Sequence, residues 1–359
     1  MKNRVIYMVL GLFLFAGTSI FAHEIPVEAE HIGKSEKDLN VTELILEHVG
    51  DAYDWHILTI KGHSVSIPLP VIVRGSNGVW RIFLSSRFEH GHAGYEGFSI
   101  AREGKYKGKI VEKNVSGEEI RPLDFSLTKN AVSLIMSSTV LIILIMICAN
   151  WYRRRKVEEA SPKGFVAMME MLIMSIVDDV VKPCVGKNYR RYTPYLLTVF
   201  FFIFFNNLLG IIPVFPGGAN VTGNIAITCV LAICTFIVVN SFGTKEYWKE
   251  IFWPDVPAWL KVPVPIMPAI EVVGMFTKPF ALMIRLFANI LAGHAIVLGL
   301  TCVVFVTVGL GAAMNAGMSV LSVVMTVFID FVELLVAFIQ AYVFTLLSAV
   351  FIGLSQVEA

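Results

Sequence analysis

The chain has 359 residues, of which 56% are hydrophobic and 16% are charged, and its formal net charge at pH 7 is +1. Its mean hydropathy of +0.70 is far above that of an average soluble protein, so composition favours an integral membrane protein. The net charge says little by itself because the charges are unevenly placed along the chain. Nothing in the sequence supports nucleic-acid binding. The sequence also has no Walker-type phosphate loop, which argues against ATP hydrolysis by this chain.

The first residues have the pattern of an export signal. Lys2 and Arg4 precede the apolar run 5–15, and mostly small residues follow it up to Ala22. We therefore expect a signal peptide over residues 1–22. An uncleaved signal anchor is the alternative reading of the same pattern.

Residues 23–127 are polar, and we expect them to form a small exported domain that contains β-structure. The alternating stretches 55–60 and 79–84, with the turn 75–78 before the second, are typical of strands and a hairpin. Seven of the eight histidines fall in this domain: His23, His31, His48, His56, His63, His90 and His92. The motif 89–92 has no Cys partner and no helical spacing, so we read these histidines as surface residues and expect no metal or cofactor.

Residues 128–359 are predicted to form an all-α polytopic membrane domain. We expect five spans, at about 128–151, 193–213, 223–242, 264–308 and 318–355. The first three have ordinary spanning length, whereas the last two have about twice the apolar length that a perpendicular helix needs. This length predicts a steeply tilted antiparallel hairpin, with Pro279 as a plausible kink point.

The distribution of basic residues predicts the orientation of the spans. Lys and Arg cluster after the first and the third span, whereas the loops 215–222 and 309–317 contain neither residue. Basic loops are normally cytoplasmic. We therefore expect an exported N-terminus and a cytoplasmic C-terminus.

Polar and ionisable residues concentrate in the last two spans, although such residues are unfavourable at membrane depth and usually line a pathway or form pairs. They are Glu271, Lys278, Arg285, Asn289, His294, Asp330, Glu333 and Gln340. At about 100° per residue, the first three share one helix face, and Asn289 stays near that face. His294 points away from it.

If the last two spans form an antiparallel hairpin, the sequence predicts which of their residues lie opposite each other. If Gln340 is level with Arg285, His294 lies opposite residue 331, within about two residues of Glu333. The imidazole and the carboxyl group can both take and release protons, so the pair would form a proton entry path. Arg285 stays protonated, and it would force a passing carboxylic acid to ionise and would bar cations from crossing directly. Because spans one to three offer no acid at that depth, this acid must come from another subunit.

The stretches IRLFANILAGH (284–294) and ELLVAFIQAYVFTLL (333–347) resemble subunit a of F-type ATP synthases, the stator chain beside the rotating ring of c subunits. The resemblance covers residues 128–355 and includes 206–213, Asn224, Glu271 and 277–279. The exported segment 61–122 is a departure, since most members have a much shorter N-terminus.

The resemblance implies a role for each polar residue. Arg285 matches the essential arginine that faces the ring carboxylate, and Gln340 matches the glutamine beside it. Asn289, His294 and Glu333 match the half-channel from the outside, and Glu271 matches the half-channel to the cytoplasm. For three further residues the sequence does not decide between a structural role and a supporting role in the proton path: Lys278, Asp330 and Asn224.

The implied setting is the bacterial inner membrane. The implied partners are the c ring, b-type peripheral stalk subunits, the soluble catalytic head and the lipid bilayer, and the implied ion is the proton, with Na⁺ left open. Two alternatives remain at this point. One is a self-contained ion channel or secondary transporter, and the other is a membrane-anchored scaffold whose exported domain is the working part.

Overall fold

The computed structural model describes residues 50–60, 63–91, 93–101, 106–113, 119–154, 162–212, 218–253 and 266–356. The predicted signal peptide, at 1–22, lies outside these residues, as do the side chains of all seven exported histidines. The chain divides into two compact units. The first consists of Met1–Ile135, Ile212–Ala219 and Cys302–Ser319, and the second of Met136–Ile211, Asn220–Thr301 and Val320–Ala359.

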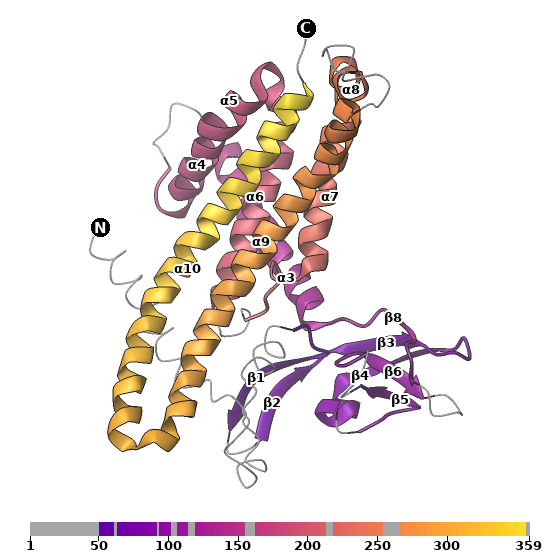
Figure 1. The fold of residues 1–359 in the computed structure, drawn as a ribbon, viewed down its shortest axis with the longest axis vertical. Coiled ribbons are helices and arrows are strands. Elements are labelled where there is room, and N and C mark those ends of the chain that lie inside the picture. The colour runs from indigo at the N-terminus through magenta and orange to yellow at the C-terminus, as the bar shows by residue number, and fades with distance from the viewer. Residues whose placement is uncertain are drawn as a thin grey trace. The chain divides into compact units, whose positions relative to one another are not determined.

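Short antiparallel strands build the N-terminal part of the first unit that the structure describes (Figure 1). The described strands are β1 (Asp54–Ile60), β2 (His63–Pro68), β3 (Pro70–Arg74), β4 (Trp80–Leu84), β5 (Phe98–Ile100), β6 (Ile110–Lys113), β7 (Glu119–Ile120) and β8 (Leu123–Asp124). β1 pairs with β2, and two three-stranded sheets have the orders β4-β3-β8 and β5-β6-β7. A 3-10 helix, η1 (Ser85–Gly91), follows β4.

The expected hairpin is the β3–β4 pair, in which Ile72 lies opposite Ile82. Its turn needs Gly78, which adopts a φ of 75° that other residues rarely take. The core of this unit is a cluster of buried side chains: Tyr53, Val71, Val73, Phe88, Phe98 and Ile110.

One partly buried hydrogen bond connects the residue before β1 with β8, the last strand of this unit. The Tyr53 hydroxyl donates to the Asp124 carboxylate over 2.5 Å. Burial, and then the hydrogen bond and the charge of Asp124, raise the pKa of Tyr53 well above its ordinary value.

Helices make up the remainder of the described chain (Figure 1). They are α3 (Lys129–Arg153), α4 (Phe165–Ser175), the π-helix η2 (Ile176–Val181), α5 (Lys182–Val185), the 3-10 helix η3 (Gly186–Asn188), α6 (Tyr189–Ile211), α7 (Ile225–Ser241), α8 (Lys245–Phe252), α9 (Ile266–Val306), the 3-10 helix η5 (Thr307–Leu310) and α10 (Ala312–Ser355).

Four helical runs in the described part are long and apolar enough to cross a membrane: Lys129–Arg153, Phe165–Ile211, Met267–Gly309 and Ala312–Ser355. The pair α7 and α8, bent by 103° at their junction, would make a fifth. This arrangement, together with the β-sheets of the N-terminal region, confirms the predicted fold class.

The last two helices have the unusual length that the sequence predicts. α9 has 41 residues and α10 has 44, so at 1.5 Å per residue each is about 60 Å long or more, twice the apolar thickness of a bilayer. α9 continues as a helix through Pro279, so the proline does not break it.

The segment between the first span and residue 193 contains helices where the sequence suggested a basic loop. α4, η2 and α5 occupy residues 165–185. Ile176, Val180 and Val181 are buried in the same apolar cluster as α6 and α10. α10 approaches α5 so closely that a Cβ added to Gly353 would lie 1.9 Å from the Cys184 carbonyl oxygen. Only glycine fits there.

Candidate functional site

α9 and α10 run side by side in opposite directions, and contacts along their length fix the register. The Ser322 hydroxyl donates to the Leu300 carbonyl over 2.7 Å. Further along the pair, the Lys278 ammonium lies 5.9 Å from the centre of the Phe351 ring. The polar side chains singled out above therefore share one scaffold of two packed helices.

His294 and Glu333 meet between these helices. His294 Nδ1 lies 3.2 Å from Glu333 Oε1, and the exposed fractions of the two side chains are 20% and 8%. The proximity expected from helical spacing is therefore present. The pair thus brings two titratable groups together in a place that is largely removed from water. Asp330, half-buried one turn before Glu333, is close enough to act on it electrostatically.

Gly293 makes room for this pair, and the sequence reading missed it. A Cβ at Gly293 would lie 2.9 Å from Glu333 Oε1 and 3.2 Å from its carboxyl carbon, closer than real side chains approach. The signal was the glycine immediately before the histidine in LAGH. A glycine inside a long helix costs about 1 kcal/mol relative to alanine, which is a reason to ask what its missing side chain permits.

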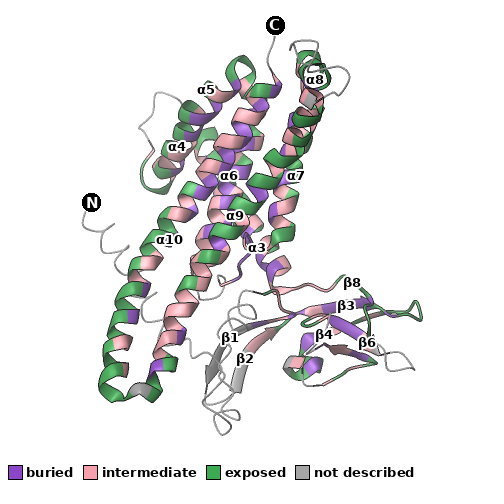
Figure 2. Cartoon of the chain, in the orientation of Figure 1, coloured by how far each residue is buried: buried purple, intermediate pink, exposed green. Residues whose placement is uncertain are grey.

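Arg285 lies on an uncovered face of α9. It is exposed, as is Asn289 one turn later, whereas Leu282 and Leu286 are buried on the other side of the helix. Within the described residues, no carboxylate oxygen approaches the Arg285 guanidinium within the 4.0 Å that defines an ion pair. The Arg285 charge is therefore exposed on the surface of this chain, and Figure 2 shows that α9 has exposed residues along its length.

Gln340 is buried, with 7% of its surface exposed, and the described residues contain no hydrogen bond between it and Arg285. The predicted alignment of Gln340 with Arg285 puts His294 opposite residue 331. The contact is instead made with Glu333, two residues, or about 3 Å, further along α10.

Polar residues also gather at the other end of the hairpin, around a small cavity of about 20 Å³. Asn240, Tyr247 and Lys278 are among its lining residues. The Tyr247 hydroxyl donates to Asn240 Oδ1 over 3.3 Å. Glu271, which is half-buried, lies within electrostatic range of Tyr247. Most of the other lining side chains are apolar, and a cavity of this size has room for about one water molecule.

Asn224 has a local role in the structure. It is the N-cap of α7, and its side chain accepts a hydrogen bond from the Ala226 amide over 3.0 Å. Asparagine is a favoured N-cap because it satisfies one of the free amides of the first turn. An Asn directly before an apolar run is the sequence signal for this cap.

Two adjacent asparagines connect α6 to its neighbours and were noticed in the sequence only as part of a motif. Asn206 Oδ1 accepts a hydrogen bond from the Ser137 hydroxyl over 2.8 Å. The amide group of Asn207 donates to the Ala337 carbonyl over 3.2 Å, one turn from Glu333. These buried bonds hold α3, α6 and α10 in fixed relative positions. In the described part of the chain, no three His, Cys, Asp or Glu side chains are arranged to hold a metal ion.

Comparison with known families now decides the assignment. A family model described as the ATP synthase A chain matches residues 133–353. The chain belongs to this family. A second model, described as a domain of unknown function (DUF8433), matches residues 44–125, which cover the β-strands of the N-terminal region.

Relatives in this family are similar over the same region. The ATP synthase subunit a of Chlorobium phaeobacteroides (strain DSM 266) is 42% identical over 239 residues, which are 65% of this chain and 66% of the relative. ATP synthase subunit a 2 of Chlorobaculum tepidum is 40% identical over 250 residues, 67% of this chain and 66% of the relative. ATP synthase subunit a of Myxococcus xanthus is 41% identical over 251 residues, 67% of this chain and 77% of the relative. The chain thus spans about two thirds of the length of the first two relatives.

Proposed function

We propose that this chain is the proton-translocating stator subunit of an F-type ATP synthase and that it stands beside a ring of c subunits. Membership of the ATP synthase A chain family supports the class. The observation that carries the mechanism is the position of Arg285, exposed on α9 and without a carboxylate of the described chain in ion-pair range. A charge so placed in an apolar helix calls for an acid on a neighbouring subunit.

Arg285 would act as a fixed positive charge. Its guanidinium does not lose its proton at any working pH, so it does not relay protons. It keeps a carboxylate that passes in front of it ionised, and it bars cations from moving straight across the membrane. An ion can then cross only on the neighbouring acid. Each elementary charge that crosses down the membrane potential releases about 2.3 kcal/mol per 100 mV, and this energy is available for rotation.

The outer half-channel would run past Asn289, His294 and Glu333. The contact of 3.2 Å between the imidazole and the carboxyl group supports proton exchange between them. Asn289 lies on the exposed face one turn from Arg285 and would hydrogen-bond the incoming proton carrier near the ring. Gln340 would line the boundary between the two paths.

The cytoplasmic half-channel would include Glu271 and the small cavity near it. Asn240, Tyr247 and Lys278 line that cavity, and their hydrogen-bonding groups would hold a water molecule in it. A proton leaving the ring carboxylate would reach the cytoplasm through this water and Glu271. ATP hydrolysis would drive the same path in reverse.

The remaining assignments follow from the same proposal. Residues 1–22 would be a signal peptide, 23–127 an exported domain and 128–359 the membrane domain, in the bacterial inner membrane with the C-terminus in the cytoplasm. The partners would be the c ring, b-type peripheral stalk subunits and, through them, the soluble catalytic head. The translocated ion would be H⁺.

Reconstitution separates this function from a self-contained channel or transporter. The complete complex in vesicles should pump protons when ATP is added. The purified chain alone, in vesicles carrying a potassium diffusion potential, should pass protons no faster than protein-free vesicles, because the carrier acid is missing. Sustained proton flux through the chain alone would contradict the proposal.

A further inference from the structure

Strand β4 turns three large apolar side chains outward and an arginine inward. Trp80, Ile82 and Leu84 are exposed by 51%, 73% and 50%, whereas Arg81 and Phe83, between them, are half-buried. A sheet with one face in water normally turns its apolar residues inward and its charged residues outward. The outward face of β4 is therefore not built for water.

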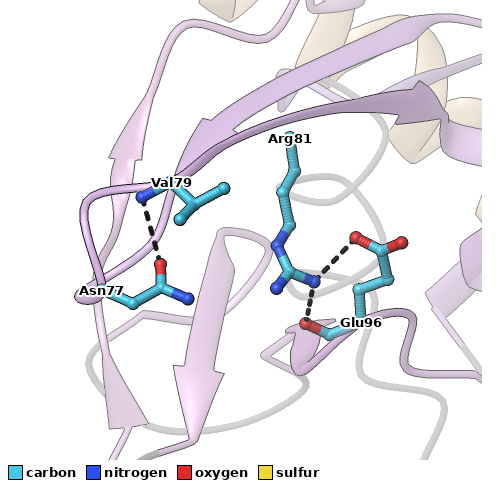
Figure 3. A network of polar contacts seen from close by, with 4 residues as sticks. All are labelled: Asn77, Val79, Arg81 and Glu96. Carbon is cyan, nitrogen blue, oxygen red and sulfur yellow. Dashed lines mark hydrogen bonds and ion pairs between the residues drawn. The ribbon is translucent and has the colours of Figure 1, made fainter.

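This orientation of β4 is fixed by specific contacts of the inward arginine, drawn in Figure 3. Arg81 Nη1 forms an ion pair of 2.7 Å with the Glu96 carboxylate and donates to the Glu96 carbonyl over 3.1 Å. Its guanidinium also lies over the Phe98 ring, at 5.9 Å from the centroid. At the turn, Asn77 Oδ1 accepts a hydrogen bond from the Val79 amide (Figure 3). Because a slip of one residue would turn every side chain over, these contacts specify the outward apolar row.

The apolar surface continues on the other edge of the sheet. Leu123 and Phe125, at and just after β8, are exposed by 59% and 64%. The Phe125 ring lies 5.7 Å from the Trp80 ring, and the Arg74 guanidinium lies 5.8 Å from the Trp80 ring. We call this surface the outer sheet face, and it consists of Trp80, Ile82, Leu84, Leu123 and Phe125. An exposed apolar surface of several adjacent large side chains marks an interaction site.

The outer sheet face is tied to the beginning of a membrane-spanning helix. The Phe125 amide donates to the Ile72 carbonyl over 2.9 Å, which continues the pairing of β8 with β3. The Lys129 amide, at the first residue of α3, donates to the Ala52 carbonyl over 2.8 Å. Only four residues lead from Phe125 to Lys129, which is at most about 13 Å of extended chain. The face is therefore held within a short distance of the first residue of α3.

We propose that the outer sheet face rests in the interfacial layer of the lipid bilayer, in the leaflet where α3 begins. Trp and other aromatic side chains favour this layer because one part of the ring system is apolar and another is polar. Arg74, beside Trp80, would bind lipid phosphate groups from the edge of the same face. The inference requires only that α3 spans the membrane, so it stands independently of the proposed proton path.

Spin labels in the reconstituted full-length chain test this placement. The five native cysteines are replaced, and a nitroxide is attached at Ile82→Cys or, independently, at Leu123→Cys. The control is Ser86→Cys, an exposed position on η1 just after β4. The vesicles contain phosphatidylcholine and phosphatidylglycerol, and relaxation is measured with dissolved oxygen and with a water-soluble nickel chelate.

The labels at positions 82 and 123 should collide severalfold more often with oxygen than with the nickel chelate, and the label at position 86 should show the opposite preference. If the first two labels are as accessible to the nickel chelate as the control, the face is in water and the proposal is wrong. Shielding of both labels from both reagents would also overturn it, because a protein partner would then cover the face.

Discussion

The substitution Gly293→Ala tests whether the contact between His294 and Glu333 carries protons. The added Cβ would lie 2.9 Å from Glu333 Oε1, so the carboxyl group must move away. The end of a glutamate side chain swings aside easily, so we expect normal folding and assembly. The swing breaks the contact with the imidazole, however. A hydrogen bond to a charged group contributes about 1.5–3 kcal/mol, which corresponds to a roughly tenfold to hundredfold loss of the paired geometry.

The assay is ATP-driven proton pumping in inverted membrane vesicles, with the amount of assembled complex measured in the same preparation. Gly274→Ala and Gly299→Ala are matched controls on α9, because a Cβ at either position meets no other atom within 4 Å. Both controls carry the same gain in helix propensity. Pumping should fall by about tenfold or more in Gly293→Ala alone. Equal pumping in all three variants would refute the assigned role of the pair.

Three further predictions follow from other contacts. Exchange of the pair, with His294→Glu and Glu333→His in one chain, should restore much of the pumping that either single substitution removes, because the same two groups still meet; a double variant no better than the singles would contradict this. Ser137→Ala should destabilise the membrane domain by about 1–3 kcal/mol, because Asn206 loses its buried donor, and an unchanged thermal unfolding midpoint in detergent would contradict this. In the first unit, the raised pKa of Tyr53 stabilises the fold below its ordinary pKa of 10.0, and this contribution is lost as pH rises through the higher folded value. The difference in tyrosinate absorbance between wild type and Tyr53→Phe should appear only well above pH 10.0; ionisation near that value would contradict the assignment.

Helical spacing in the last two spans predicted which side chains meet between them. Two long apolar helices joined by a short loop have few ways to pack, so the positions of His294 and Glu333 already predicted their meeting. The same reasoning could not fix the register to better than two residues, because side-chain packing decides it. For this reason His294 was expected opposite residue 331, and its contact is with Glu333.

Other features depend on contacts between distant segments, which no local pattern reveals. The turn at 75–78 predicted the β3–β4 hairpin, but the addition of β8 to β3 joins residues about fifty positions apart. The helices over 165–185 were hidden because nearby basic residues suggested a cytoplasmic loop, although FVAMMEMLIMS is apolar. The tight fits at Gly293 and Gly353 become visible only when the neighbouring helix is in place.

The most direct test of the account is Arg285→Ala in the assembled complex, compared with Arg285→Lys and with proton pumping and passive proton leak measured together. The account predicts that pumping disappears in Arg285→Ala at normal assembly, because nothing then keeps the ring acid ionised or separates the two half-channels, and that the passive leak rises. Lysine keeps the positive charge without the planar guanidinium, so Arg285→Lys should leak less than Arg285→Ala. Pumping at a near-normal rate in Arg285→Ala would contradict the central claim.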